Sequence, residues 1–332
     1  MSGDNGGRPS SRDERPGSAV GGRWTAELGL VSVAAGWGLT FTLIQEAIRD
    51  LPPLAFVAYR FLAAAPLLAV PYASALRRLP ARGWLVGMAL GVLLMSGYVT
   101  QTIGLAHTSA SNAGFITGLY VIFTPLLGWV LLRQSLTPWT VSCIAGTTLG
   151  LLLLSGFGGA WRPFGDGVML LCSVSFAAHI LATDWALRRF AVGPLVAVEL
   201  AVCAVLSFLI AAAANDLVRP AGWAVWTALL FTSVIASALA YFVQSYAQIR
   251  TSPTHTSLIL ATEPAFAGVF GYWLAGDRMA VIGWLGAAIM LAAILAMEIR
   301  PFLVRRAQAQ CAAVGSPQAS AIATQEGRRS SD

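Results

Sequence analysis

The feature that most constrains this chain is a series of apolar runs, each long enough to cross a lipid bilayer as a helix. A transmembrane helix needs about 20 mostly apolar residues, because the hydrocarbon core is about 30 Å thick. Backbone polar groups in that core must be satisfied within the segment, which leaves the helix as the natural structure. The sequence therefore predicts an all-α polytopic membrane protein with ten transmembrane helices, at residues 27–46, 53–73, 84–103, 111–132, 138–156, 167–187, 192–214, 223–246, 254–275 and 280–299.

The composition favours the same class and excludes others. Hydrophobic residues make up 57% of the 332 residues and charged residues 11%, whereas soluble domains carry about 25% charged residues. The formal charge of +6 has no clustered basic face interleaved with aromatics, so no nucleic-acid partner is expected. The four cysteines show no CxxC or Cys/His spacing, and phosphate-binding glycine loops are missing. The sequence predicts no metal site, no cofactor and no structural disulfide.

The distribution of arginine predicts the orientation. With the N-terminus in the cytoplasm, sixteen arginines fall on the cytoplasmic side, and four fall outside: Arg49, Arg162, Arg219 and Arg278. Basic residues are retained in cytoplasmic loops, so both termini are predicted to be cytoplasmic in a multi-pass protein of the cell membrane. Residues 1–25 and 303–332 have little apolar content, and we expect them to be disordered cytoplasmic tails.

An internal repeat relates the two halves of the chain. The 34 residues from Tyr98 and the 34 from Tyr241 align without a gap at an offset of 143, with eight identities that include Gln101 and Gln244. The matched positions lie at equivalent points of the third–fourth and eighth–ninth predicted helices. Residues 26–156 and 167–299 therefore read as two five-helix repeats, and the odd number gives them opposite topologies. In secondary transporters, inverted repeats place the substrate site near the bilayer midplane.

Four short motifs accompany the repeat: WGLTF at 37–41, YRF at 59–61, SASNAGFI at 109–116 and EPAFAGVFGYWLAGD at 263–277. With them, residues 28–299 resemble the drug/metabolite transporter superfamily, in its ten-helix EamA-domain branch. The family usually has a Gly-Glu-Arg-Leu-Thr-like turn after helices four and nine, whereas this chain reads RQSLT and GDRMA. The resemblance implies an exporter or exchanger of small metabolites. It also implies a cavity lined by helices three, four, eight and nine with parts of one and six, and peripheral helices five and ten.

Glu263 is the residue least suited to an apolar helix. It is tenth in its run, about 15 Å from the start and near the midplane, where a charge costs about 2.5–3.5 kcal/mol on insertion scales. One hypothesis is a neutral carboxyl that stabilises a kink, and the other is a carboxyl that carries a proton or binds a substrate amine. Pro264 is expected to kink the ninth helix by freeing the carbonyl of Leu260. Pro125 lies near the equivalent place in the fourth helix, so a second kink is expected there.

Three further ionisable residues lie inside predicted helices. Arg60 is expected to extend its long side chain to the outer headgroups. Its alternative is an ion pair with a carboxylate, for which Glu199 lies near the repeat-equivalent position, or with an anionic substrate group. His179 is predicted to be a neutral, hydrogen-bonded side chain rather than a proton shuttle.

The uncharged candidates for the site occur in both repeats. Tyr98, Gln101, Tyr241 and Gln244 are expected to contact a polar ligand, and hydrogen bonding between helices is their alternative role. Trp37 and Tyr120 are expected to form cavity walls.

Two functions of different classes follow from these residues. The first is a secondary active transporter of amino-acid-like compounds or drugs, working by alternating access, with a small molecule, membrane lipids and protons as its expected partners. The alternative is an integral membrane enzyme acting on a lipid or lipid-linked substrate through Glu263, His179 and Arg60. No motif with catalytic spacing supports the enzyme. The sequence leaves open a homodimer, the substrate, the direction of transport and the coupling ion.

Overall fold

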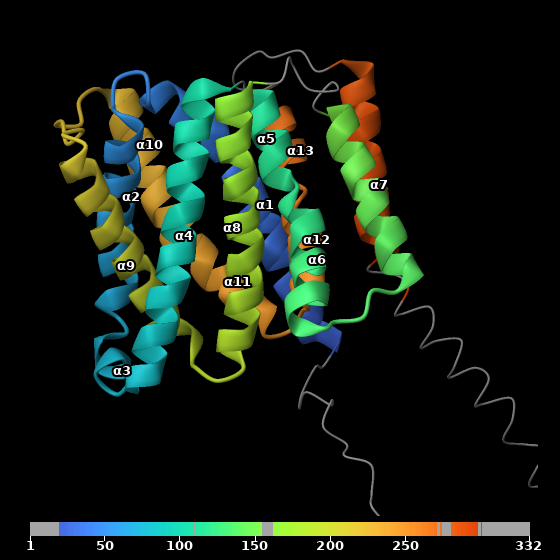
Figure 1. Ribbon diagram of the computed structural model, residues 1–332, viewed down its shortest axis with the longest axis horizontal. Coiled ribbons are helices and arrows are strands. Elements are labelled where there is room, and N and C mark those ends of the chain that lie inside the picture. The colour runs from blue at the N-terminus through green and yellow to red at the C-terminus, as the bar shows by residue number, and fades with distance from the viewer. Residues whose placement is uncertain are drawn as a thin grey trace, which may run out of the picture.

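The computed structural model describes residues 20–108, 110–154, 162–270, 273, 280–297 and 300. Within them the chain forms helices that run side by side as one bundle (Figure 1). The elements are α1 (Val20–Ala47), α2 (Pro53–Ala69), α3 (Ala73–Arg77), α4 (Ala81–His107), α5 (Ala110–Gly118), α6 (Tyr120–Leu132), α7 (Pro138–Leu154), α8 (Pro163–Leu187), α9 (Val192–Ala213), α10 (Trp223–Ser233), the π-helix η1 (Val234–Leu239), α11 (Ala240–Gln248), α12 (Pro253–Leu260) and α13 (Glu263–Phe270). A last apolar helix spans Val281–Met297.

The all-α prediction is confirmed, but several predicted helices are not continuous. Five helical stretches in the described part are long and apolar enough to cross a membrane: Trp24–Ala47, Ala81–His107, Pro163–Leu187, Val192–Ala213 and Trp223–Gln248. The first helix begins at Val20, seven residues before its predicted start, and so includes part of the predicted N-terminal tail. The rest of that tail, the C-terminal tail and the loop at 274–279 lie outside the described residues.

The fourth and ninth predicted helices each break into two segments, and the breaks are equivalent. The fourth is interrupted at Leu119, and α6 starts at Tyr120. The ninth is interrupted at residues 261 and 262, and α13 starts at Glu263. Tyr120 and Glu263 are separated by the repeat offset of 143 residues. The two halves therefore share the place of the break as well as the residues around it.

The prolines act differently from the sequence prediction. A kink was expected at Pro125, but the fourth helix is interrupted before Tyr120, and Pro125 lies inside α6, five residues after its start. Pro264 does not kink a continuous helix either, because it is the second residue of α13. A first-turn residue needs no intrahelical N–H partner, so proline is tolerated there at little cost.

The eighth predicted helix also departs from a regular α-helix. It consists of α10, η1 and α11, and η1 is a six-residue π-helix. A π-turn contains one more residue per turn, which rotates everything after it by about 100° relative to an unbroken α-helix. The rotation decides which side chains of α11 face the centre of the bundle.

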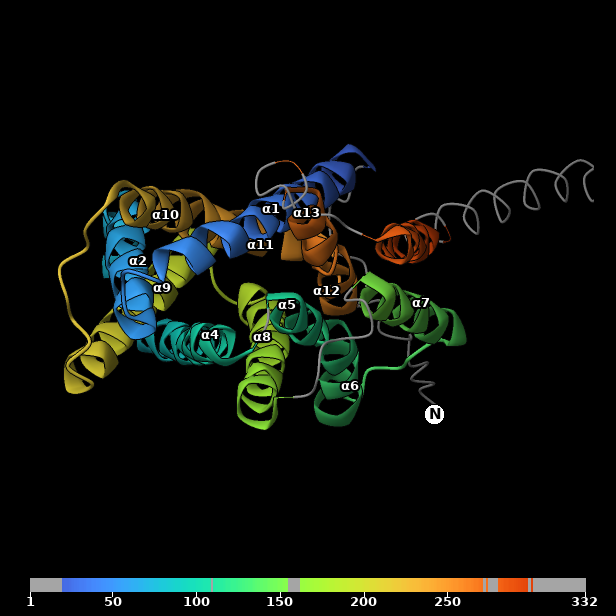
Figure 2. The same ribbon diagram turned by 90° about the horizontal axis from the view of Figure 1, so that it is seen from above.

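The bundle places α7 and the last helix at one end, and α2, α9 and α10 at the other (Figure 2). Between these ends, α4 packs on α8 and α9, while α1 packs on α11 and α13. Close approach between α7 and the last helix depends on Gly150, where an added Cβ would lie 2.6 Å from the carbonyl oxygen of Gly286.

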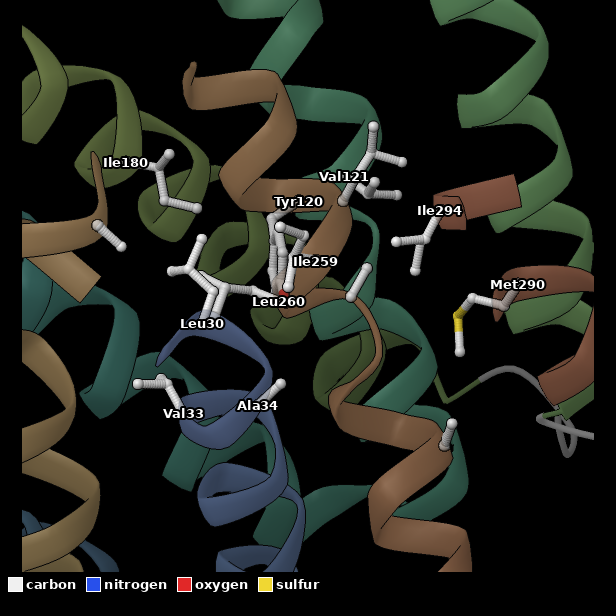
Figure 3. Packing of buried hydrophobic residues seen from close by; sticks show 14 of the residues in the cluster. Leu30, Val33, Ala34, Tyr120, Val121, Ile180, Ile259, Leu260, Met290 and Ile294 are labelled. Atoms are coloured by element: carbon white, nitrogen blue, oxygen red, sulfur yellow. The ribbon is translucent and has the colours of Figure 1, made fainter. Parts of the chain in front are cut away.

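Apolar side chains from several helices pack around the interruption of the ninth helix. Figure 3 shows Leu30, Tyr120 and Leu260 lying next to one another, although they belong to α1, α6 and α12. The same cluster extends through Val121 to Met290 in the last helix. These neighbours hold the two segments of the interrupted helix in place, together with backbone hydrogen bonds that Thr262 makes to both segments.

Candidate functional site

A cavity lies between α1, α2, α4, α8 and the interrupted helices α5–α6 and α11–α13. Its empty volume is about 650 Å³ when its open mouth is included. The described part of α7 and of the last helix contributes no residue to its lining. Nine of the predicted site residues line it: Trp37, Arg60, Tyr98, Gln101, Tyr120, His179, Tyr241, Gln244 and Glu263. Of the other two, Pro264 follows Glu263 in α13, and Glu199 lies behind His179.

Two repeat-related tyrosines meet at the centre of the bundle. The hydroxyl of Tyr241 donates to the hydroxyl of Tyr98, with 2.9 Å between the oxygens. Their ring centroids are 6.2 Å apart in an edge-on arrangement. The contact therefore brings equivalent positions of the two halves together at the wall of the cavity.

Arg60 points into the bundle, contrary to the sequence prediction. Its side chain is only 2% exposed. The guanidinium Nε donates to the hydroxyl of Ser237 at 2.7 Å, and Nη2 donates to the carbonyl of Ala236 and the hydroxyl of Tyr98, both at 3.1 Å. The guanidinium also lies over the ring of Tyr98, 4.3 Å from its centroid, a cation–π geometry. The headgroup prediction was wrong because these acceptors satisfy the charge inside the protein.

Two of the three acceptors of Arg60 come from the π-helix. Ala236 and Ser237 both belong to η1, and the Ala236 carbonyl also accepts a hydrogen bond from the indole of Trp37 at 2.8 Å. One carbonyl thus joins α1 and α2 to the eighth helical stretch. The sequence analysis missed both η1 residues, because a small, apolar helical segment carries no signal for a π-turn.

Glu199 pairs with His179 rather than with Arg60. The Nε2 of His179 and the Oε1 of Glu199 are 2.7 Å apart, and the two side chains are 2% and 1% exposed. The ring of His179 also meets the ring of Tyr241 edge-on, at 5.7 Å between centroids. The pair therefore links α8 to α9 directly behind the cavity, and the predicted alternative of an Arg60–Glu199 ion pair does not form.

Glu263 opens α13 at the cavity wall and is 7% exposed. Among the described residues, none donates a hydrogen bond to its carboxylate, and the charge that acts on it is that of Arg60. Helix α1 approaches its backbone closely at Gly38, where an added Cβ would lie 2.8 Å from the carbonyl oxygen of Glu263. The backbone at the start of α13 is thus packed tightly against α1, and the Glu263 side chain lines the cavity.

Gln244 and Gln248 form a hydrogen-bonded pair at the base of the cavity, and only Gln244 was among the predicted site residues. The amide nitrogen of Gln248 donates to the carbonyl of Ile180 at 2.9 Å, and the amide nitrogen of Gln244 donates to Gln248 at 3.3 Å. Gln248 is one helical turn after Gln244, so the helical spacing from a known candidate could have identified it.

Known proteins were compared with the chain as a whole. The model of the EamA-like transporter family matches it twice, at residues 24–156 and 163–298. The chain belongs to the EamA-like transporter family. The resemblance drawn from the sequence motifs is therefore confirmed.

Individual relatives agree with this membership. An uncharacterized transporter of Archaeoglobus fulgidus is 30% identical over 292 residues, which cover 84% of this chain and 87% of that protein. The uncharacterized transporter YoaV of Bacillus subtilis is 22% identical, covering 79% of this chain and 93% of its own. A chloroplastic WAT1-related protein of Arabidopsis thaliana is 26% identical, and the matched region covers 82% of this chain and 68% of that protein.

A solved crystal structure also shares the fold. It superposes with a TM-score of 0.72 over 86% of this chain and 99% of the solved chain, at 17% sequence identity. The protein is thus a multi-pass membrane transporter of the EamA-like family, and it is not an enzyme. The alternative of a lipid-modifying membrane enzyme is set aside.

Proposed function

We propose that the protein is a secondary active transporter that exports or exchanges small metabolites across the cell membrane by alternating access. The observation that carries the proposal is the cavity between two helix interruptions at repeat-equivalent positions. Interrupted helices near the midplane expose backbone and side-chain polar groups to a ligand, which is how many secondary transporters build their sites. Tyr120 and Glu263, the first residues after the two interruptions, both line the cavity.

The proposed topology is ten membrane spans in two inverted repeats, residues 26–156 and 167–299, with both termini in the cytoplasm. The two family matches in the chain and the sixteen-to-four distribution of arginines support it. Each repeat contributes five spans, so that the second crosses the membrane with opposite polarity. Rocking of one repeat against the other about the Tyr98–Tyr241 contact would then expose the cavity to each side in turn.

In this topology we interpret the conformation as outward-facing. The cavity lining reaches Ile44 and Leu105, each within one turn of the end of its helix. Those ends lie outside when the N-terminus is cytoplasmic. Toward the cytoplasm, the hydrogen bond from Gln248 to the carbonyl of Ile180 joins α11 to α8 below the cavity. Breaking that bond is the step that opens the inner side.

Glu263 is the proposed coupling residue, which takes up and releases a proton or pairs with a substrate amine. It is a carboxyl at the cavity wall with no hydrogen bond from the described residues, so its partner changes without breaking other contacts. Carboxylates buried among membrane helices mark proton and substrate pathways in many pumps and transporters.

The test uses proteoliposomes loaded with a pH-sensitive dye and exposed to a panel of amino acids, amino-acid amides and small amines. We expect at least one compound to move protons through the wild-type protein. Glu263→Gln should abolish that movement while the variant still inserts and unfolds at a normal temperature. The control is Glu46→Gln, which removes an exposed carboxyl paired with Arg49 at the end of α1. Unchanged coupled flux in Glu263→Gln would reject the role of this residue.

A further inference from the structure

Polar atoms at the cavity that have no hydrogen-bond partner indicate which hydrogen-bonding groups the ligand carries. Burying a polar group without a partner costs about 1–3 kcal/mol, so such atoms are retained where a ligand completes them. Among the described residues, the buried atoms without a partner include the hydroxyl of Tyr120 and the Oε1 of Gln244, and both residues line the cavity. The Glu263 carboxyl joins them, since none of the described residues donates to it.

The open atom of Gln244 is an acceptor, and the hydrogen-bond chain at the cavity floor fixes this assignment. A backbone carbonyl only accepts hydrogen bonds, so Gln248 must direct its NH₂ group at Ile180. The Oε1 of Gln248 then faces Gln244, and the NH₂ group of Gln244 donates a hydrogen bond to it. Only the Oε1 of Gln244 is left over, so an amide oxygen and a carboxylate at the cavity have no hydrogen-bond donor among the described residues.

The positive charge at the cavity is already satisfied. Three of the five N–H groups of Arg60 donate to Ser237, Ala236 and Tyr98, and the face of the guanidinium lies over the ring of Tyr98. None of the described residues donates a hydrogen bond to the negative group, Glu263, although the charge of Arg60 acts on it. The imbalance favours a ligand that donates hydrogen bonds and carries positive charge over one that carries a carboxylate.

The rest of the wall is apolar and aromatic. Trp37, Phe41, Phe176 and Leu260 line the same cavity, and the rings of Trp37 and Tyr241 lie 5.5 Å apart between centroids. Aromatic faces bind both apolar groups and organic cations. A ligand with a protonated amine at one end and an apolar or aromatic body at the other would fill both parts.

From these contacts we infer that the transported substrate is a protonated organic amine with an apolar or aromatic body. Its ammonium group binds Glu263 and the Oε1 of Gln244, and a substrate carboxylate adds no affinity. The inference rests on the proposed function, because it assigns the substrate class of the same cavity.

The test compares four probes that share a phenyl ring and a short carbon chain but differ in charge. They are 2-phenylethylamine as the cation, 2-phenylethanol as the neutral compound, 3-phenylpropanoate as the anion and L-phenylalanine as the zwitterion. Binding to the full-length protein in lipid nanodiscs is measured by calorimetry at neutral pH. We expect the amine to bind at least tenfold tighter than the alcohol, and phenylalanine to bind no tighter than the amine.

Variants test which residues cause the preference for the amine over the alcohol. Glu263→Gln should reduce the preference for the amine over the alcohol to less than threefold. Tyr120→Phe and Thr147→Val each remove a hydroxyl that has no partner among the described residues, but Thr147 is on α7 and does not line the cavity. Tyr120→Phe should weaken amine binding severalfold, whereas Thr147→Val should leave it unchanged. This pair tests the inference even if Glu263→Gln fails to fold.

Three results would overturn the inference. They are a carboxylate probe that binds tighter than the alcohol, an amine preference that survives Glu263→Gln, and no binding of any probe at millimolar concentration. Flux of the amine into proteoliposomes is measured separately. Tight amine binding without flux would count against the transport mechanism and not against the ligand class.

Discussion

The contact between α1 and α13 gives a prediction that depends on geometry alone. A Cβ added at Gly38 would lie 2.8 Å from the backbone nitrogen of Ala267, from the carbonyl oxygen of Glu263 and from the Cβ of Phe266. Ordinary van der Waals contact begins near 3.4 Å, so the two helices would have to separate by about 0.6 Å. Two of the three atoms belong to backbone and cannot rotate away. We therefore expect Gly38→Ala to destabilise the protein.

The size of the effect follows from two opposing terms. Overpacking a tight contact costs about 1–3 kcal/mol. Replacing glycine by alanine inside a helix returns about 0.5–1 kcal/mol of that cost, because the unfolded chain loses conformational freedom. The net loss for Gly38→Ala is then about 0–2.5 kcal/mol, with a middle value of about 1 kcal/mol.

Gly36 is the matched control on the same helix. An added Cβ there would have its nearest neighbour, the Cγ2 of Ile235, at 3.9 Å. Gly36→Ala should therefore benefit from the higher helix propensity of alanine without causing a clash. We expect it to be as stable as the wild type or up to about 1 kcal/mol more stable. The difference between the two variants isolates the clash, at about 1–3 kcal/mol.

The assay is the free energy of unfolding, relative to the wild type, from SDS titration in mixed micelles. Both variants differ from the wild type by one methyl group in the same helix, so detergent effects are shared. Equal stability of the two variants, or greater stability of Gly38→Ala, would refute the close approach of α1 to the start of α13. Since the clash at Gly38 would displace the start of α13, which carries Glu263 at the cavity wall, Gly38→Ala should also weaken binding of the amine probe, whereas Gly36→Ala should not.

Two further predictions concern the polar centre. A double-mutant cycle of Tyr98→Phe and Tyr241→Phe should give a coupling free energy of about 0.5–1.5 kcal/mol. Tyr98→Phe should be the costlier single change, because its hydroxyl also accepts a hydrogen bond from Arg60, and a coupling near zero in SDS titration would argue against the contact. His179→Leu should cost about 3–5 kcal/mol by leaving the buried Glu199 without its partner. Adding Glu199→Met should recover part of that loss, and a double variant less stable than His179→Leu alone would contradict the pairing.

The sequence by itself determined the class of fold and most of the residues that line the cavity. Apolar run length and charge content are properties of each segment, so they predicted helices across a bilayer without knowledge of their packing. The 143-residue offset predicted that Tyr98 and Tyr241 are equivalent. The rarity of ionisable residues in apolar helices was enough to single out Glu263, Arg60 and His179.

Only the tertiary structure decided where the helices break and which groups pair. A break at Leu119 and a π-turn at Val234–Leu239 depend on neighbouring helices that supply or remove backbone partners, and no local pattern encodes them. The direction of Arg60 depended on acceptors in η1, nearly 180 residues away in the chain. Hydrophobicity fixes that a segment is a helix, but the rotation of that helix about its axis is fixed by packing, and this rotation sets which side chains meet.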